Sequence, residues 1–145
     1  MINGIIDAIS IALNKEFGDR YEIYMEEIRQ DLKEPCFFIS ILEPTSRLHT
    51  GKRHFRENQF CIQYFPETDQ KQRECNEIAE RMLGCLEYVL ADGDDRPMRG
   101  TKMKYGVVDG ILNFFVNYDC FTYLAKPPQD PMEEMETSTS AKEGE

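Results

Sequence analysis

The sequence predicts an α+β domain in which two helices pack on one antiparallel or mixed sheet of about five strands. Apolar residues recur at helical spacing in two segments, residues 1–17 and about 69–90. Shorter segments alternate between apolar and polar residues, or are apolar throughout, as strands do. The predicted order is α-β-β-β-α-β-β, with a long hairpin between the second and third strands. This order favours a layer of helices on a layer of strands.

The chain length and its charge limit the function classes. A length of 145 residues suits one domain with a single core. We expect this domain to span residues 1–125. Residues 126–145 contain prolines, acids and small polar residues but no aromatics, which predicts a disordered acidic tail. The formal net charge of −10 argues against general nucleic-acid binding, because phosphate contacts need clustered Lys and Arg.

No targeting or membrane segment is evident. The sequence has no basic stretch followed by an apolar stretch of the kind that secretory signals contain. No apolar run approaches the roughly 20 residues of a membrane-spanning helix, so we expect no membrane partner. The five cysteines are odd in number and form no CxxC pair. We therefore expect buried, reduced thiols in a protein made in a reducing cytoplasm.

The first predicted elements are a helix and a strand. In residues 1–17, Ile5, Ile9, Leu13 and Phe17 share one helical face, and Gly18 supplies a stop. Residues 20–27 alternate less cleanly, but their aromatic and β-branched content favours a strand.

The stretch 34–66 reads as a long hairpin. Its first strand, residues 36–42, is apolar on both faces and is expected to end at Pro44. The second strand runs from about residue 55 to 65 and alternates. We expect the core of the domain to contain the apolar residues Phe37, Ile39, Phe60, Ile62 and Tyr64. The polar middle of the hairpin is predicted to project as an arm.

A second helix and two more strands follow. The helix is predicted to begin near Asp69, with Gln72 completing a capping box, and to run for about six turns to Leu90. Residues 92–95 form a predicted turn. Residues 98–108 and 111–124 read as two strands joined by Asp109-Gly110, a strong two-residue hairpin signal. On the last strand, one face is predicted to hold Leu112, Phe114, Val116, Tyr118 and Cys120.

Two basic clusters are candidate interaction sites. Residues 44–56, which we call the basic arm, contain no acid. The arm is a candidate for electrostatic contact with an acidic protein surface or a nucleic acid. Its candidate residues are Arg47, His49, Lys52, Arg53, His54 and Arg56. A second basic run consists of Arg96, Arg99, Lys102 and Lys104, and lysines there are equally consistent with protection of an edge strand against aggregation.

Catalytic, cofactor and metal sites are not expected. The sequence has no GxSxG, phosphate loop, dinucleotide fingerprint or HExxH motif. A Cys61–His54 pair is the strongest enzymatic alternative, but the cysteines lie in apolar segments, which disfavours a reactive thiolate. The acidic run at residues 92–95 fails the calcium-loop pattern, because its sixth position is Pro97 instead of Gly and its twelfth is Met103 instead of Glu.

Three stretches of the chain resemble one family. The block EPCFFISILEP…GKRHFRENQFCIQYFP, the opening INGIIDAISIALNKEFGDRYEIY and the later NFFVNYD are similar to the small tail terminator proteins of long-tailed bacteriophages, prophages and phage-tail-like particles. The resemblance covers about residues 1–125 and leaves the acidic tail unmatched. It rests on the whole chain, with one distinctive block, and on no catalytic motif.

The resemblance implies a structural protein of tail assembly. Such a subunit forms a ring, usually of six copies, that caps the head-proximal end of the tail tube, stops its polymerisation and offers a docking surface for the neck. The implied partners are further copies of the chain, the tube protein, the sheath protein in a contractile tail, and a neck or head-completion protein. The implied location is the bacterial host cytoplasm during assembly and then the virion tail. Two alternatives stay open: a head–tail connector component, and a nucleic-acid contact protein that uses the basic arm on DNA in the channel.

Overall fold

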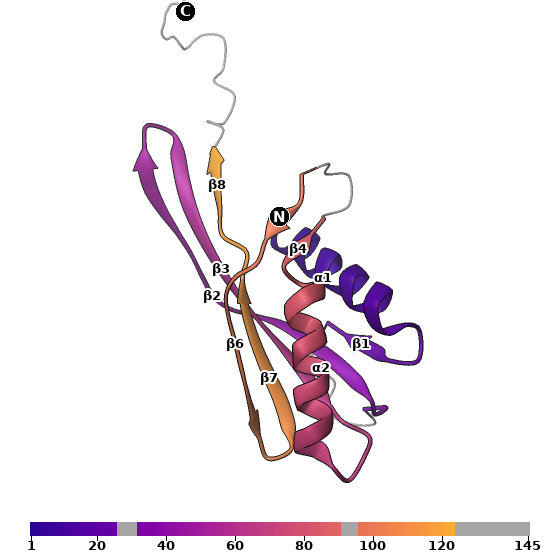
Figure 1. Ribbon diagram of the computed structural model, residues 1–145. Coiled ribbons are helices and arrows are strands. Elements are labelled where there is room, and N and C mark those ends of the chain that lie inside the picture. Colours follow the sequence, from indigo (N-terminus) through magenta and orange to yellow (C-terminus); the bar gives the residue numbers. More distant parts are fainter. Residues whose placement is uncertain (26–31, 91–95, 124–145) are drawn as a thin grey trace, which may run out of the picture. The chain divides into compact units, whose positions relative to one another are not determined.

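The computed structural model describes residues 1–25, 32–90 and 96–123 (Figure 1). The predicted turn at 92–95 and the predicted tail at 126–145 lie outside these residues. The helices are α1 (Ile2–Phe17) and α2 (Lys71–Cys85). The strands are β1 (Glu22–Tyr24), β2 (Cys36–Thr50), β3 (Arg53–Phe65), β4 (Tyr88–Val89), β5 (Met98–Arg99), β6 (Thr101–Val108), β7 (Ile111–Asn117) and β8 (Cys120–Tyr123).

The predicted α+β class is confirmed. The main sheet has six strands, one more than expected, in the order β1-β2-β3-β7-β6, and β8 also pairs with β3. The sheet is mixed, because β1 runs parallel to β2 whereas β3–β7 and β7–β6 are antiparallel. β4 and β5 form a separate two-stranded sheet. The central strand is β3, which has partners on both sides.

The chain divides into two compact units. The larger contains residues 1–46 and 56–120 and holds the helices and most of the sheet. The smaller contains residues 47–55 together with the chain from Phe121 onward, of which residues 121–123 are described.

The core of the larger unit lies between the helices and one face of the sheet. Along β3 and β7, alternate residues are paired and buried, as in Phe60 with Val116 and Ile62 with Phe114. The five residues expected in the core (Phe37, Ile39, Phe60, Ile62 and Tyr64) are all buried. Both helices contribute to the same cluster, through Leu13 of α1 and Met82 of α2 among others. The periodic patterns therefore identified the core correctly.

Residues on the opposite face of the sheet are buried or partly buried, and most of them are uncharged. The pairs on this face are Gln59 with Asn117, Cys61 with Phe115, and Gln63 with Asn113. The amide of Gln63 donates to Asn113 Oδ1 at 3.0 Å. Amide pairs thus lie on either side of an apolar pair.

The hairpin differs from the prediction at Pro44. β2 does not end there but continues to Thr50, and a turn at Gly51-Lys52 leads into β3. The registered pairing of β1 with β2 ends at Phe38. Beyond that point β2 is an edge strand among the described residues, where a proline without an N–H donor is tolerated. Glu43 has a φ of 26°, which marks a local irregularity just before the proline.

The second helix is shorter than predicted. α2 ends at Cys85, after about four turns, and the chain then forms β4. The carbonyl of Glu87 accepts a hydrogen bond from the amide of Gly100 at 2.7 Å, which draws the chain out of the helix. The apolar spacing predicted a longer helix because Leu86 and Val89 fit a buried helical face. Both residues are also buried in the non-helical chain that follows α2.

The predicted capping box at Asp69 is also wrong. The first cap residue is Gln70, and it makes no side-chain cap hydrogen bond. Instead the carboxylate of Glu74 reaches back and accepts from the amides of Glu67 and Thr68 and from the hydroxyl of Thr68, at 2.7–3.1 Å. It also accepts from the hydroxyl of Tyr64 at 2.5 Å. One carboxylate therefore joins the loop, the helix and the central strand.

The last two predicted strands are each divided. The segment 98–108 breaks at Gly100, and the segment 111–124 breaks after Asn117. At the second break, Asn58 of β3 takes part in three hydrogen bonds with Tyr118 and Asp119, at 2.9–3.1 Å. Of the residues predicted to share a face of the last strand, Tyr118 is buried, whereas Cys120 lies beyond the break and is only partly buried. The Asp109-Gly110 turn is confirmed, with positive φ at both residues.

Replacing Glu74 with Gln should lower the free energy of unfolding by about 1–3 kcal/mol, because charge-assisted hydrogen bonds are lost. Burial alone would raise the pKa of the Glu74 carboxyl, but its hydrogen bonds with Thr68, Tyr64 and the two amides lower it overall. A lowered folded-state pKa stabilises the fold above the unfolded value of about 4.3, and the effect is lost as pH falls through the folded pKa. Urea denaturation should therefore show a difference that is largest above about pH 5 and shrinks in acid.

The control for this experiment is Glu77→Gln on the same helix. Glu77 is exposed and lies 3.9 Å from Arg73, so its loss should cost less than about 0.5 kcal/mol. Equal effects of the two substitutions would contradict the role given to Glu74.

Replacing Gly100 with Ala should lower the free energy of unfolding by about 1–3 kcal/mol through overpacking. A Cβ there would lie 2.6 Å from the carbonyl oxygen of Leu86 and 2.9 Å from Val116 Cγ2. Gly84→Ala is the matched control, because a Cβ at this position of α2 meets nothing within 4 Å. That control should stabilise the protein by about 0.5–1 kcal/mol through helix propensity. Thermal unfolding that ranks the two variants in the opposite order would show this interpretation to be wrong.

Candidate protein-interaction surface

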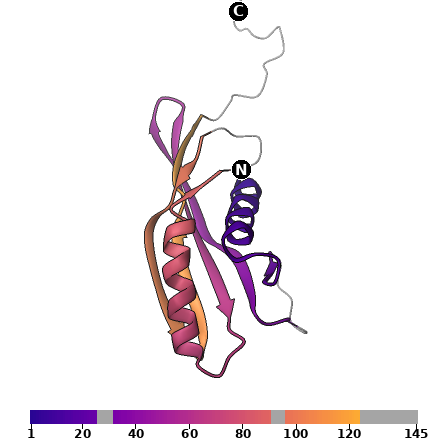
Figure 2. The same cartoon turned by 45° about the vertical axis from the view of Figure 1, so that its right-hand side comes forward.

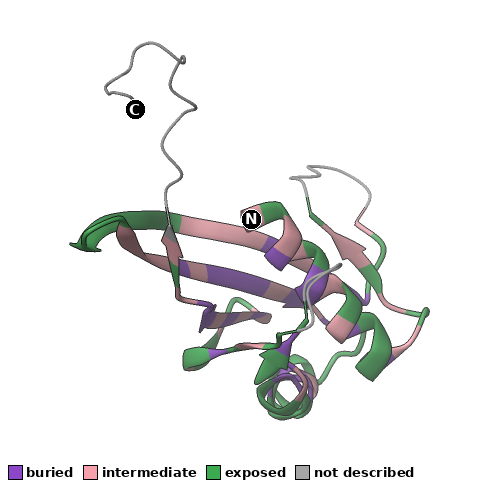
Figure 3. Ribbon diagram, turned by 90° about the horizontal axis from the view of Figure 1, so that it is seen from above, coloured by how far each residue is buried: buried purple, intermediate pink, exposed green. Residues whose placement is uncertain are grey.

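The basic arm lies on the two strands of the β2–β3 hairpin and on the turn between them. Residues 43–52 are exposed, as the green hairpin tip in Figure 3 shows. Arg47, His49 and Lys52 are exposed, whereas Arg53, His54 and Arg56 are half-buried. The predicted arm is therefore an ordered hairpin with charged side chains along both strands.

Three residues of the arm contact Phe121 of β8, and a fourth contacts one of these three. The guanidinium carbon of Arg53 lies 4.1 Å from the ring centre of Phe121. The rings of His49 and Phe55 lie 5.2 and 5.1 Å from the same ring. Arg47 lies over Phe55 at 5.1 Å. We call these residues the arm cluster: Arg47, His49, Arg53, Phe55 and Phe121.

All members of the arm cluster belong to the smaller unit. On β2 the side chains of Arg47 and His49 share a face, as do Arg53 and Phe55 on β3, because alternate residues of a strand point the same way. Stacking on aromatic rings holds the guanidinium groups in place, and contacts of this type contribute about 0.5–1 kcal/mol at exposed sites. The cluster is thus a basic surface whose guanidinium groups pack on the rings of Phe55 and Phe121.

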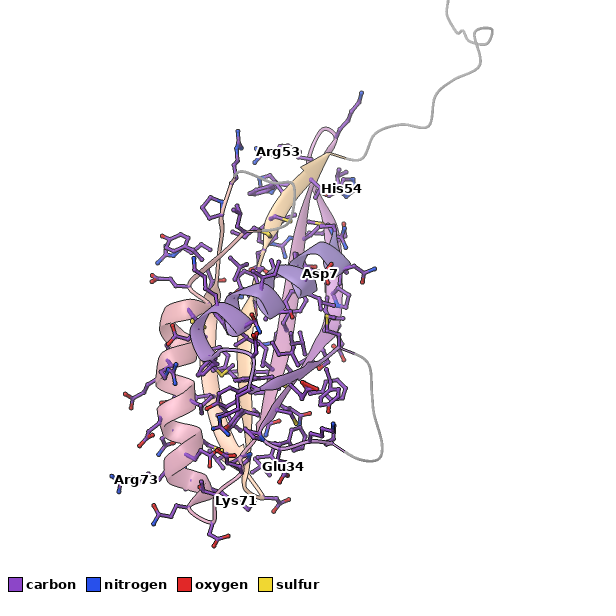
Figure 4. All side chains as sticks on the ribbon, turned by 90° about the vertical axis from the view of Figure 1, so that its right-hand side faces the viewer. Asp7, Glu34, Arg53, His54, Lys71 and Arg73 are labelled. Carbon is purple, nitrogen blue, oxygen red and sulfur yellow. The ribbon has the colours of Figure 1, made fainter. Side chains whose placement is uncertain are left out.

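The remaining histidine and arginine of the arm lie apart from the cluster. His54 stands between Arg53 and Phe55, so it points to the other face of β3; Figure 4 labels Arg53 and His54 near the start of that strand. Arg56 belongs to the larger unit, where its guanidinium contacts the sulfur of Met1 at 3.2 Å. Of the six predicted residues, only Arg47, His49 and Arg53 enter the arm cluster.

Sequence reasoning found the charges of this surface but missed its aromatic members. Phe55 was expected only as the start of a strand, and Phe121 only as part of the last strand. Phe121 is 44% exposed and lies within the arm cluster. No spacing in the sequence connects it with residues 47–55, because the connection arises from the pairing of β8 with β3.

The second basic run makes local contacts in the larger unit. Lys102 lies at a bulge, with a φ of 51°, and its amine is 3.8 Å from Glu57. Lys104 lies over the ring of Phe115 at 5.5 Å. Both lysines are on β6, an edge strand of the sheet, where lysine discourages unwanted strand pairing. Arg99 is exposed on β5, and Arg96 is exposed just before it.

The thiols are not activated. Cys36, Cys61 and Cys75 are buried as predicted, whereas Cys85 and Cys120 are only partly buried. Burial raises the pKa of the Cys36 thiol to about 11 and that of Cys85 to about 12. Burial also raises the pKa of Cys61. Cys61 and His54 are seven residues apart on β3, or about 23 Å along an extended strand, so the proposed pair is not formed.

Open hollows lie on the surface of the larger unit, and one of them lies beside paired charges. One hollow of about 310 Å³ lies beside α2 and is lined by residues that include Tyr21, Tyr64 and Glu74. At its rim Arg20 pairs with Glu67 at 2.7 Å, a hydrogen bond that lowers the pKa of the Glu67 carboxyl. Arg81 pairs with Glu16 at 3.0 Å. Within the residues that the structure describes, no three His, Cys, Asp or Glu side chains are placed to hold a metal ion.

Neither described helix has the length and apolar composition that crossing a membrane requires. Among the described residues, the basic arm is the candidate surface for binding.

The comparisons with known proteins agree with this description. Residues 4–131 match the family described as phage tail terminator protein. The match covers most of the chain, including both helices, the sheet and the basic arm. No curated protein sequence matches the chain. The chain therefore belongs to the phage tail terminator protein family, whose members have a structural role in phage tail assembly.

Proposed function

We propose that the protein forms a ring, of six copies by the family resemblance, that caps the head-proximal end of a phage tail tube. The ring stops tube polymerisation and presents a surface to which the neck docks. The observation that carries this proposal is the family match over residues 4–131. The protein acts by binding and not by catalysis. Its partners are further copies of itself, the tube protein and a neck protein, and it resides in the virion tail.

The distribution of charge supports a role for the basic arm in this assembly. The arm holds four of the 17 basic residues of the chain and no acid. Residues 126–145 hold two bases and six acids, so the rest of the chain has 11 bases and 21 acids and a net charge of −10. A ring contact is heterologous, since one patch of each copy meets a different patch on the next. A basic arm on an acidic body provides two such complementary patches.

The two units are suited to different parts of this work. The larger unit contains a complete helix–sheet core, with side chains such as Ile9, Phe60 and Phe114 almost fully buried. The smaller unit presents Arg47, His49 and Lys52 to solvent. Changes of exposed charge in the smaller unit should therefore alter binding without loss of the fold. This separation makes the arm a suitable target for mutation.

Arg47→Glu combined with Lys52→Glu should impair ring formation or tube capping, because like charges replace the proposed attraction. We expect tubes longer than normal and a loss of capped ends by at least about tenfold, as two charge reversals at an interface cost several kcal/mol. Electron microscopy of tubes assembled with each protein, together with the mass of the purified protein, measures both effects. Normal rings and normal tube lengths would contradict the arm hypothesis.

The matched control is Lys71→Glu combined with Arg73→Glu, which makes the same change of charge at the start of α2. Both residues are exposed, and Figure 4 labels them together there. This control should cap tubes as the wild type does. Equal defects in both variants would indicate a general effect of net charge. A stable monomer that never associates with tubes would count against the terminator function itself.

The same proteins test the nucleic-acid alternative. If the arm contacts DNA, the purified wild-type protein should bind duplex DNA with an affinity that falls steeply with salt, and the arm variant should lose that binding. Capping should then be normal in the arm variant when empty tubes are used. Under the proposal, DNA binding is weak and capping of empty tubes is lost.

A further inference from the structure

We propose that copies of the chain join through the edges of the main sheet, with β6 of one copy added antiparallel beside β1 of the next. In this contact Lys104 lies opposite Glu22, and the ring of Tyr105 enters a hollow between α1 and β1. The inference rests on the proposed function, since it names a contact between neighbouring subunits of the ring. No residue of the basic arm takes part, so the contact adds to the one proposed there.

The main sheet of each copy ends in two different outer strands. These are β1 and β6 in the order β1-β2-β3-β7-β6, and among the described residues neither has a partner on its outer side. Figure 1 labels the two strands on opposite sides of this sheet. An outer strand offers a row of N–H and C=O groups to an added strand. Because the two strands differ, pairing one with the other on the next copy is heterologous, as a ring requires.

A hollow lies beside the β1 edge, on the side of the sheet that carries the helices. It has a volume of about 750 Å³ and is lined by residues 10–11, 14–15, 19 and 21–23. Among these, Ile11 of α1 is 56% exposed, and Ile23 of β1 is only partly buried although it packs against the core. A strand added to a sheet edge places alternate side chains in pockets of this kind. The β1 edge therefore offers room for a large side chain.

The second half of β6 carries exposed side chains that fit this description. Tyr105 is 39% exposed and Val108 is 61% exposed. Tyr105 pairs with the core residue Phe114 of β7, and its ring stacks on that residue at 6.2 Å. Tyr105 therefore lies on the side of the sheet that carries the helices and is held there by its own chain. When β6 is added beside β1, the exposed part of this ring is covered by Ile11 and Ile23.

Charge selects β1 as the partner of β6. Both Lys104 and Glu22 are exposed. Lys104 faces away from the helices, because it pairs with Phe115 of β7. Glu22 faces the same side, because the next residue of β1 pairs with the core residue Phe37. Opposite charges across a pair of strands stabilise it and like charges weaken it, so Lys104 favours β1 and disfavours the β6 of another copy.

The strand directions agree with an antiparallel junction. β1 runs parallel to β2, whereas β7 runs antiparallel to both β3 and β6. Since β2 and β3 form a hairpin, β6 runs opposite to β1 within one copy. Rotation about an axis along the strands keeps these directions from one copy to the next. With Lys104 opposite Glu22, Tyr105 then lies opposite Tyr21, which lines the hollow.

The contact can be tested on the full-length protein with a photoreactive amino acid. Tyr105 is replaced with p-benzoylphenylalanine, which keeps an aromatic ring there and bonds to nearby C–H groups on irradiation. Dilute ¹⁴N- and ¹⁵N-labelled proteins are mixed, and the reaction is run on concentrated protein and on protein bound to tail tubes. We expect cross-links from position 105 to residues 10–23 that join chains of different isotopes. The same replacement of Tyr88, which is also exposed, should give no cross-link to residues 10–23.

Exchange of the two charges tests the register. Glu22→Lys and Lys104→Glu each place like charges opposite one another, so each should raise the midpoint concentration of association about tenfold. The two substitutions combined restore an opposite pair and should return the midpoint to within about twofold of the wild type. As a control, Glu80→Lys combined with Lys104→Glu leaves the same net charge and should stay as weak as Lys104→Glu alone, because Glu80 is exposed on α2. Analytical ultracentrifugation and co-sedimentation with tubes measure these midpoints.

The outcomes separate this contact from the proposed function. Cross-links confined to single chains, their absence in both samples, or a combined variant no better than the single ones would each overturn the proposal. If these tests fail while the wild type still forms oligomers that cap tubes, the contact is wrong and the proposed function stands. If chains of different isotopes cross-link through position 105 but do not cap tubes, the contact stands and the capping function fails.

Discussion

The alternation of side chains along β3 is the constraint on which the rest of the structure depends. Phe60, Ile62 and Tyr64 are buried in the cluster to which both helices contribute, and the residues between them face the other side of the sheet. Figure 2 shows the two helices beside this sheet. Because the period of a strand is two, a slip of one residue would exchange the two faces completely. Both helices, the partner β7 and the hairpin with β2 all depend on this one register.

Polar contacts fix β3 at two points. Near its end, Tyr64 donates to Glu74 and so sets where α2 begins. In its middle, Asn58 bonds to Tyr118 and Asp119 and sets where β7 ends. The buried side chains between these points supply most of the driving force, and the polar contacts select the arrangement. A carboxylate with several donors is well suited to this, since its hydrogen bonds are directional and strong.

Local patterns predicted those parts of the fold that local physics decides. The helical stripe of α1, the Asp109-Gly110 turn and the five core residues of the hairpin follow from periodicity and turn chemistry. The errors lie where a contact with another part of the chain determines where an element begins or ends. The end of α2 depends on a hydrogen bond between Glu87 and Gly100, and the start depends on Glu74 instead of Asp69. Pro44 lies within a strand because the pairing of β2 with β1 ends at Phe38, so that β2 is an edge strand at Pro44 among the described residues.

For the candidate surface, the sequence revealed the basic residues but not the aromatic residues on which they pack. The absence of acids in residues 44–56 was visible, whereas Phe121 joined the arm only through strand pairing. The periodic patterns indicated an α+β domain and the motif search found no catalytic motif, whereas the role in tail assembly came from the family likeness.

The hairpin also has a consequence for how related proteins can diverge. Asn58 marks the end of the part of β3 that belongs to the helix–sheet core, and the strand beyond it toward Arg53 pairs outside that core. Two residues added to, or removed from, each strand of the hairpin would keep every side chain on its face, whereas a single residue would reverse them. Evolution can thus change the reach of this surface in steps of about 7 Å while the core stays the same.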